Sequence, residues 1–414
     1  MALLINNLAF CRYNQIKACE LSTFEPFALD DKILSQGVEI SQTLDQLRLE
    51  IYPPDAKKTL KKFPIQEVAT YVGTSVNNLK RLDLEEKGPR PEVLTGGRRY
   101  YTAEQIEEMR NFLDKTGKSA AKKYVPQRRM GEKLQVVAIV NFKGGSGKTT
   151  TTAHLAQHLS LTGHRVLAID LDPQGSLSAL HGFQPELDKN LSLYDAIRYD
   201  DERQDIRSTI QKTNFPMLDI IPANIELQEY EYDTPVAMQN STEGKTFFSR
   251  IASTLANVEE DYDVVLIDCP PQLGYLTLTA LSAATSILIT VHPQMLDLMS
   301  MSQFLLMLGN ITRTLKDAGV AVQMDWMRYL ITRYNASDVP QRRMVGLMET
   351  ILADDILKTP MLNSTAISDA GLTKRSLYEL ERGNVNRGTY DRALLCMQSV
   401  NGEIQELIHR AWGR

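Results

Sequence analysis

The sequence of 414 residues predicts an α/β fold, a mainly parallel sheet with helices on both faces, preceded by an N-terminal helix and a winged helix-turn-helix domain. Three observations support this prediction. Six short apolar runs alternate with helical patterns after residue 133, a Gly-rich loop follows the first run, and a basic stretch precedes them all. Continuous apolar runs are typical of strands buried on both faces, and their alternation with helices favours parallel pairing.

Length and charge divide the chain into parts. A chain of 414 residues exceeds one compact core and suits two or three domains. The net charge is −5, yet residues 56–130 carry 17 Lys and Arg against 9 Asp and Glu, a local charge of +8, while the remainder carries −13. This asymmetry predicts a basic module joined to an acidic main domain. We therefore expect a helical segment over 1–55, a DNA-binding domain with a basic linker over 56–130, and the α/β domain over 131–414.

The same numbers exclude several classes of protein. No apolar run reaches about 18 residues, so no membrane-spanning helix is expected, and the N-terminus lacks the features of a secretory signal. The four cysteines lie far apart without a CxxC pair. That argues against a disulfide framework or a structural zinc site and favours the cytoplasm.

Residues 1–55 are predicted to be helical and partly amphipathic, and Pro53 and Pro54 end the pattern. Two interpretations stay open with equal weight: a helix packed on its own domain, or a dimerisation helix. The apolar residues recur at spacings of mostly three to four, as on one face of a helix: Leu29, Ile33, Leu34, Val38, Ile40, Leu44 and Leu47.

Residues 57–114 carry the pattern of a helix-turn-helix. Pro64 suits the first turn of a helix, Gly73 supplies a turn, and Thr74 or Ser75 can cap a second helix. The outer side of that second helix would face the major groove of DNA. The residues predicted there are Asn77, Asn78, Lys80 and Arg81.

A wing is predicted next, with a hairpin turn at Gly96-Gly97 and with Arg98 and Arg99 on its rim. Thr102 then caps a further helix in a capping-box pattern. The stretch resembles the winged helix-turn-helix of MerR-type regulators, which implies binding to an operator. The alternative is a small helical packing domain with a solvated basic surface, and the basic stretch at 115–130 is either a DNA contact or a plain tether.

A Gly-rich loop lies in the segment VNFKGGSGKTTTT at residues 140–152. Such a loop exposes consecutive backbone N–H groups that cradle phosphate oxygens at a helix N-terminus. Phe142 stands where the ordinary P-loop pattern has its first glycine, and the additional Lys143 makes this the deviant Walker A form. We predict that ATP or ADP binds here together with Mg²⁺. The predicted nucleotide-binding residues are Lys143, Gly144, Gly145, Ser146, Gly147, Lys148, Thr149 and Thr150.

Three aspartates complete the predicted site. Lys148 can reach the β- and γ-phosphates and the Thr149 hydroxyl can hold Mg²⁺. Asp170 and Asp172 end one apolar run and Asp268 ends another. Because the carboxyl ends of parallel strands meet at one edge of the sheet, these carboxylates are expected near the nucleotide, where they can hold Mg²⁺ or orient a water.

These motifs resemble those of the ParA/MinD group of ATPases over residues 134–335. The whole chain is similar to ParA-type partition proteins with an N-terminal DNA-binding domain, and above all to the RepA proteins of repABC plasmid cassettes. The segments that carry this resemblance are FKGGSGKTTTTAHLAQHL, GHRVLAIDLDPQGSLSALHGFQPE, LTKRSLYELERG and RGTYDRAL.

The resemblance implies an ATP-driven sandwich homodimer and a weak ATPase that is stimulated by DNA and by a ParB-type centromere-binding partner. Lys143, Lys148 and Asp172 would be catalytic, with Lys143 crossing to the phosphates of the second subunit and Asp172 orienting water. Thr149, Asp268 and Asp170 would serve the metal. The protein would be cytoplasmic, bound to the nucleoid, and would segregate low-copy plasmids.

Two modes of DNA binding are also implied by the resemblance. The N-terminal module would bind an operator and repress the cassette's own transcription. The ATP-bound dimer would bind any DNA through phosphate neutralisation, with the alternative that the residues concerned are ordinary exposed cations. The candidates are Arg333, Arg342, Arg343, Lys374 and Arg375, of which Arg342 and Arg343 are the best.

Two further functions compete with partition. One is a nucleotide-gated transcriptional repressor in which hydrolysis has little role. The other is a MinD-like membrane ATPase, because the C-terminal segment NGEIQELIHRAW has an apolar stripe. Its acidic residues and few basic ones favour packing on the domain over binding to anionic lipid, so no membrane partner is expected.

Overall fold

The computed structural model describes residues 28–51, 58–117, 123–184, 190–317, 323–383 and 386–414. The chain divides into two units, Met1–Ala56 and Lys57–Arg414. In the first unit, helix α2 (Leu29–Ile51) confirms the helix predicted there, and the predicted helical residues before 28 lie outside the described part. The apolar side chains of its predicted stripe from Leu29 to Ile40 are exposed, so dimerisation through α2 stays a prediction.

The second unit begins with the winged helix-turn-helix domain. Ser75 caps the second helix by accepting a hydrogen bond from the Asn78 backbone N–H, and Gly73 makes the turn with a left-handed φ of 73°. Thr102 and Gln105 form the predicted capping box. The elements are β1 (Phe63–Pro64), α3 (Ile65–Val72), α4 (Val76–Leu84), β2 (Glu92–Leu94), β3 (Arg98–Tyr101) and α5 (Ala103–Thr116), with strand order β1-β3-β2.

A seven-stranded sheet in the order β10-β9-β4-β8-β5-β7-β6 forms the centre of the α/β domain. All neighbours pair in parallel except β6 with β7. The six strands expected from the apolar runs are present, and the short edge strand β6 was not predicted. Their bounds are β4 (Gln135–Val140), β5 (Val166–Asp170), β6 (Gln211–Lys212), β7 (Leu218–Ile221), β8 (Val264–Asp268), β9 (Ser286–Val291) and β10 (Trp326–Ile331).

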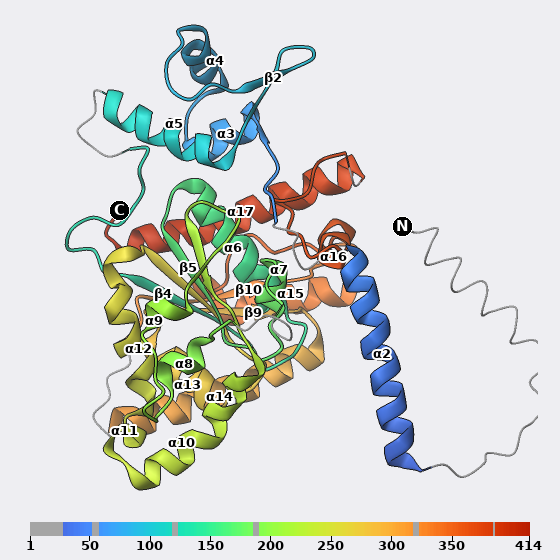
Figure 1. Cartoon of the computed structure of the whole chain (residues 1–414), viewed down its shortest axis with the longest axis vertical. Helices are drawn as coiled ribbons and strands as arrows, with labels where there is room; N and C mark the ends of the chain where they lie inside the picture. Colours follow the sequence, from blue (N-terminus) through green and yellow to red (C-terminus); the bar gives the residue numbers. More distant parts are fainter. Residues whose placement is uncertain (1–27, 52–57, 118–122, 185–189, 318–322, 384–385) are drawn as a thin grey trace, which may run out of the picture. The chain divides into compact units, whose positions relative to one another are not determined.

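Helices cover both faces of this sheet, as Figure 1 shows. Because side chains alternate along each strand, the two faces contribute to separate hydrophobic clusters. One face packs on α6 (Lys148–Thr162), α7 (Ser176–Leu180), α16 (Thr365–Leu372) and α17 (Arg387–Ala411). The other packs on α8 (Leu193–Ile197), α10 (Glu229–Asn240), α12 (Arg250–Leu255), α13 (Tyr275–Ala283), α14 (Met295–Asp317) and α15 (Val339–Leu352), and the short helices α9 (Ile206–Thr209) and α11 (Thr242–Lys245) lie in connections.

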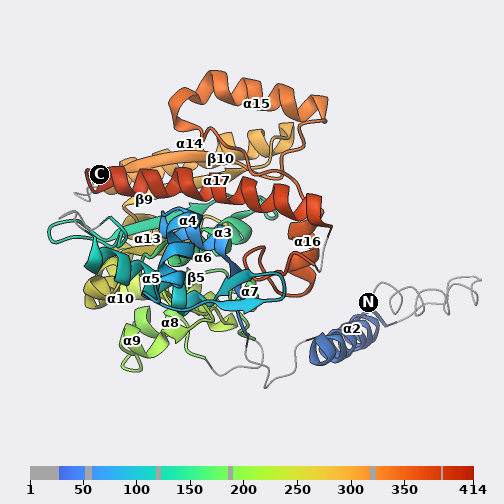
Figure 2. The ribbon, with the colours of Figure 1, turned by 90° about the horizontal axis from the view of Figure 1, so that it is seen from above.

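The C-terminal helix α17 packs on the domain, as the sequence favoured. It contacts α6, with which it lies side by side in Figures 1 and 2. Ile404 and Ile408 of its apolar stripe are fully buried, and the Glu403 carboxylate accepts hydrogen bonds from the backbone of Lys358 and Thr359. Among the described residues, no helix combines the length and apolarity needed to cross a membrane.

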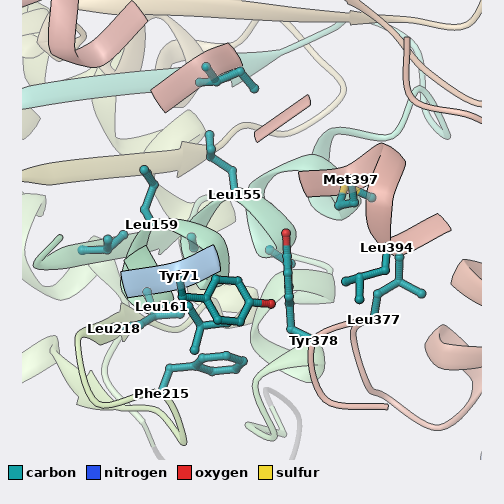
Figure 3. Close-up of a cluster of buried hydrophobic side chains, with 14 of the residues drawn as sticks. Tyr71, Leu155, Leu159, Leu161, Phe215, Leu218, Leu377, Tyr378, Leu394 and Met397 are labelled. Atoms are coloured by element: carbon teal, nitrogen blue, oxygen red, sulfur yellow. The ribbon is translucent and has the colours of Figure 1, made fainter. Parts of the chain in front are cut away.

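The winged domain shares a hydrophobic core with the α/β domain. Figure 3 shows Tyr71 of α3 beside Leu161 of α6 and Tyr378 of the segment before α17, in the same cluster as Leu155 and Leu159 of α6. The Tyr71 hydroxyl accepts a hydrogen bond from the Gln398 side chain of α17, 3.4 Å away. The helix that follows the Gly-rich loop is therefore packed directly against the winged domain.

Arg110 of α5 links α3 to α6 through hydrogen bonds. Its guanidinium donates to the Tyr71 carbonyl oxygen at 3.0 Å and to the Leu161 carbonyl oxygen, in the last turn of α6, at 2.6 Å. A Cβ atom added to Gly163 would lie 2.5 Å from Arg110 Nε, so only glycine leaves room for the side chain. The cation also opposes the negative end of the α6 dipole.

We predict that Arg110→Met lowers the free energy of unfolding by about 2–4 kcal/mol, because two buried carbonyl oxygens lose their donor. Chemical denaturation followed by circular dichroism measures the change. Lys115→Met, at an exposed position on the same helix, should leave stability within about 0.5 kcal/mol of the original. Equal stability of the two variants would contradict the structural role of Arg110.

Histidines gather along α6 and its neighbours. Burial lowers the pKa of His154, His158 and His181 to about 4 each. His154 accepts from the Leu377 backbone N–H, and His158 lies 3.1 Å from the Gln405 side-chain oxygen. Both residues therefore have structural partners, and no group of three or more metal-ligating side chains occurs among the described residues.

These neutral histidines predict acid sensitivity. Their folded-state pKa values lie below the ordinary 6.5, so the stability they contribute is complete above pH 6.5 and is lost as the pH falls towards 4. Each can cost about 3 kcal/mol at the acid end of this window. Denaturation curves of the original and of His158→Gln at pH 7.5, 6 and 5 isolate this contribution from Asp170 and Asp268, whose raised pKa values act in the opposite direction. The original should lose stability relative to His158→Gln as the pH falls, and a difference that does not change with pH would contradict the prediction.

Candidate functional site

The Gly-rich loop joins the end of β4 to the start of α6. Gly145 and Gly147 adopt left-handed φ angles of 75° and 90°, which glycine tolerates best. Nothing lies within 4 Å of a Cβ atom added to Gly144. Gly147 is the N-cap of α6 and no side chain caps this end. The first N–H groups of α6 are thus available to an anion, which the helix dipole also favours.

The flanks of the loop are anchored to neighbouring strands. The Asn141 side chain donates to the Thr290 carbonyl oxygen of β9 and accepts from the Lys143 backbone N–H at 2.8 Å. The Ser146 and Thr290 hydroxyl oxygens lie 3.0 Å apart. The loop conformation is therefore fixed by contacts with β9 as well as by its own glycines.

Lys148 begins α6 and its side chain folds back over the loop. Its ammonium donates to the carbonyl oxygens of Asn141 at 3.1 Å and Lys143 at 3.4 Å. Burial lowers the pKa of Lys148, and the charge of Asp268 opposes that shift. A lysine held inside a loop of free amides supplies the positive charge that a bound polyphosphate requires.

Asp170 and Asp268 lie directly opposite each other at the carboxyl ends of β5 and β8. Both are fully buried, and burial raises the pKa of each; the charge of Asp170 raises that of Asp268 further. The Thr152 hydroxyl donates to Oδ1 of Asp268 at 3.4 Å, and the Thr149 side chain opposes the pKa shift of Asp268. One oxygen of Asp268, Oδ2, has no hydrogen-bond partner among the described residues. A buried carboxylate oxygen without a partner, next to a threonine hydroxyl, fits a divalent cation.

Asp170 has a different surrounding from Asp268. Its Oδ2 accepts from the Ser178 backbone N–H at 2.8 Å and from the Ser178 hydroxyl at 2.7 Å, and its Oδ1 accepts from the Asp172 N–H at 3.3 Å. Asp170 thus holds the segment that follows β5. Asp172 lies in that segment, where its Oδ1 accepts from the Gln174 N–H at 3.0 Å.

Lys143 points away from Lys148 to the start of α14. Its ammonium lies 2.6 Å from Oδ2 of Asp297, whose side chain is only 4% exposed. Asp297 was not predicted, since nothing in its local sequence marks it. Exposed apolar side chains flank this pair in the sequence, namely Phe142, Met295, Leu296 and Met299.

The predicted DNA-contacting residues of the winged domain divide into two groups. Asn77, Lys80 and Arg98 are exposed. The others have partners within the domain: Asn78 donates to the Thr74 hydroxyl, Arg81 pairs with Glu85 at 2.8 Å, and Arg99 pairs with Asp83 at 2.6 Å. The Arg99–Asp83 pair ties the wing to the end of α4.

The candidates for nonspecific DNA binding lie in different places. Arg342 and Arg343 are both exposed in the first turns of α15, the arrangement that phosphate contacts need. Arg333 instead contacts the Gly-rich loop through the Gly145 carbonyl oxygen at 3.1 Å. In the basic linker, Arg128 is largely buried and donates to the Glu259 carbonyl oxygen, so it is a structural contact.

A family model described as an AAA domain matches residues 134–319, and one described as a MerR HTH family regulatory protein matches residues 63–113. A protein named replication protein A from Sinorhizobium fredii (strain NBRC 101917 / NGR234) is 60% identical over 392 residues, which cover 94% of this chain and 96% of the relative.

Two further similarities cover the α/β domain and the whole fold. Sporulation initiation inhibitor protein Soj of Bacillus subtilis (strain 168) is 33% identical over 236 residues, which cover 57% of this chain and 87% of Soj. A solved partition protein structure matches with a TM-score of 0.58 at 17% identity, covering 92% of this chain and 99% of the other. The last similarity shows that the fold is shared.

Proposed function

Because the chain belongs to the family of partition ATPases that includes ParA, Soj and the proteins named replication protein A, we propose that it segregates low-copy plasmids through ATP-controlled DNA binding. The observation that carries this proposal is the Gly-rich loop, where an uncapped helix N-terminus, a buried lysine and an unpartnered Asp268 oxygen occur together.

The residues present fit ATP or ADP with Mg²⁺. Lys148 and the amides of Gly144 to Thr150 bind the phosphates, and the Thr149 hydroxyl and Asp268 hold the metal. Bound Mg²⁺ supplies charge neutralisation on the phosphates. Asp170 fixes the position of the segment that carries Asp172, and Asp172 orients the attacking water.

A second copy of the chain completes the site in this proposal. In the described subunit Lys143 is held by Asp297, outside the loop. Exposed apolar residues on either side of this pair offer contact area to another subunit. On dimerisation Lys143 leaves Asp297 and neutralises charge on the phosphates of the partner, which makes hydrolysis dependent on the dimer.

DNA is the proposed partner in two ways. The exposed face of α4 and the wing bind an operator and repress the protein's own operon, and Arg342 and Arg343 of the ATP-bound dimer bind DNA without sequence preference. A ParB-type protein stimulates a weak ATPase. The shared core of α3, α5 and α6 also favours a second function, nucleotide-gated repression, because the helix after the loop contacts the DNA-binding domain.

The two functions are separated by measuring phosphate release and operator footprints side by side, with ADP, with ATP and without nucleotide. Partition predicts turnover that rises when nonspecific DNA and the ParB-type partner are added. Footprints that depend on nucleotide, together with no turnover under any condition, would leave only the repressor. Loss of plasmid stability in cells that carry Lys143→Gln would support partition.

A further inference from the structure

Two consecutive carbonyl oxygens of the Gly-rich loop accept hydrogen bonds from two consecutive residues that follow β10. The Thr332 hydroxyl donates to the Ser146 carbonyl oxygen at 2.6 Å, and the Arg333 guanidinium donates to the Gly145 carbonyl oxygen at 3.1 Å. The donors lie 186 and 188 residues further along the chain. The sheet order β10-β9-β4 brings them to the loop.

The backbone after β10 is shaped for this contact. Arg333 has a left-handed φ of 52°, a conformation that costs a residue with a Cβ on the order of 1 kcal/mol and persists where the surroundings enforce it. Thr332 is fully buried, and its Cβ would lie 3.3 Å from a Cβ atom added to Gly147. The loop and the 332–333 segment therefore fit together closely.

These two hydrogen bonds also orient N–H groups. A trans peptide unit is planar, and its carbonyl oxygen and N–H point in opposite directions. The Gly145 carbonyl turned towards Arg333 directs the Ser146 N–H away from Arg333. In the same way, the Ser146 carbonyl held by Thr332 directs the Gly147 N–H away from Thr332.

We propose that Thr332 and Arg333 are positioning residues, which set the Ser146 and Gly147 amides for the phosphates common to ADP and ATP. This inference rests on the proposed function, in which the loop binds the nucleotide. It also moves Arg333 from the DNA-binding surface, where the sequence placed it, to the nucleotide site. Neither residue touches the reacting atoms, so their removal weakens binding and leaves the rate at saturation unchanged.

The test measures MgADP and MgATP affinity for the full-length chain by titration calorimetry. Thr332→Val keeps the shape and removes only the hydroxyl, and it should weaken both nucleotides about tenfold, the effect of one hydrogen bond. Thr332→Ser keeps the hydroxyl and should bind within about twofold of the original. Arg333→Met, at an exposed position that folding tolerates, should weaken both nucleotides several-fold, with kcat unchanged at saturating ATP.

Thr332→Val and Arg333→Met variants with unchanged affinity would overturn the inference, and so would equal losses in Thr332→Val and Thr332→Ser. Lys148→Ala separates the inference from the proposed function: if it too binds normally, the loop is not the nucleotide site. A measurement of DNA binding completes the test. At saturating ATP, Arg333→Met should bind nonspecific DNA like the original, whereas Arg342→Ala with Arg343→Ala should bind it weakly. Loss of DNA binding in Arg333→Met under those conditions would overturn the assignment.

Discussion

Replacing Lys148 by alanine is expected to reduce MgATP affinity on the order of a hundredfold. The lysine is buried, and its ammonium donates to the carbonyl oxygens of Asn141 and Lys143 at the start of the loop. Removing it leaves the phosphate charge without a cation in a poorly solvated site, which costs about 2–5 kcal/mol for a buried charge pair. Fluorescence titration with a labelled nucleotide measures the change.

The control for Lys148→Ala is Lys133→Ala, which removes an exposed lysine just before β4 and should bind MgATP normally. Thermal unfolding without nucleotide shows whether both variants are folded. A Lys148→Ala protein that is folded and retains the original affinity would exclude the loop as the phosphate site, and the proposed roles of Thr149 and Asp268 would no longer follow.

Replacing Lys143 by glutamine is expected to abolish hydrolysis while nucleotide binding survives. In the described subunit Lys143 pairs with Asp297 and contributes its backbone, but not its ammonium, to the loop. Its charge is therefore available for the transition state in a second subunit, where a comparable cation accelerates phosphoryl transfer by about 10³–10⁵-fold. Phosphate release at saturating ATP should fall to background, with MgADP affinity within about twofold of the original.

The control here is Lys133→Gln, which makes the same change at an exposed position outside the site. A Lys143→Gln variant that lost nucleotide affinity together with hydrolysis would show that the lysine acts within its own subunit. Asp297→Asn adds a second comparison, because it removes only the charge that holds Lys143. It should favour dimer formation with ATP, as measured by light scattering.

The strands and the Gly-rich loop could be predicted because their signals are local. Each buried strand is a continuous apolar run, and the order of glycines and lysines in VNFKGGSGKTTTT specifies an anion-binding loop before a helix. The capping box of Thr102 and Gln105 is likewise a pattern of four residues. In these segments the local pattern and the tertiary structure agree.

The supporting contacts could not be predicted because their partners are distant in sequence. Asp297 lies 154 residues from Lys143, and Arg333 lies 188 residues from Gly145. Arg333 is a single arginine at the end of a strand, and its local sequence does not show whether it contacts the Gly-rich loop or DNA. Arg110 entered the sequence analysis only as one of the cations counted over residues 56–130, yet it is buried between α5 and α6.

The common core of the two domains was also hidden in the sequence. A small domain has an apolar helix face that packs in its own interior, and α3 has such a face. The sequence therefore did not show that Tyr71 of α3 also packs against α6. Short runs such as Gln211–Lys212 are polar and too brief to read as strands. Periodicity identifies which side chains are buried but not which element covers them.

Mixing two inactive variants tests most directly whether two subunits build one site. Lys143→Gln lacks the lysine that reaches the partner's phosphates, and Asp172→Asn lacks the residue that orients water. Neither variant alone should therefore hydrolyse ATP. If Lys143 acts across the dimer, each mixed dimer contains one complete site, and an equimolar mixture should recover about a quarter of the original rate by random pairing. Hydrolysis that stays at background in the mixture, while co-purification of differently tagged variants shows that mixed dimers form, would contradict the account.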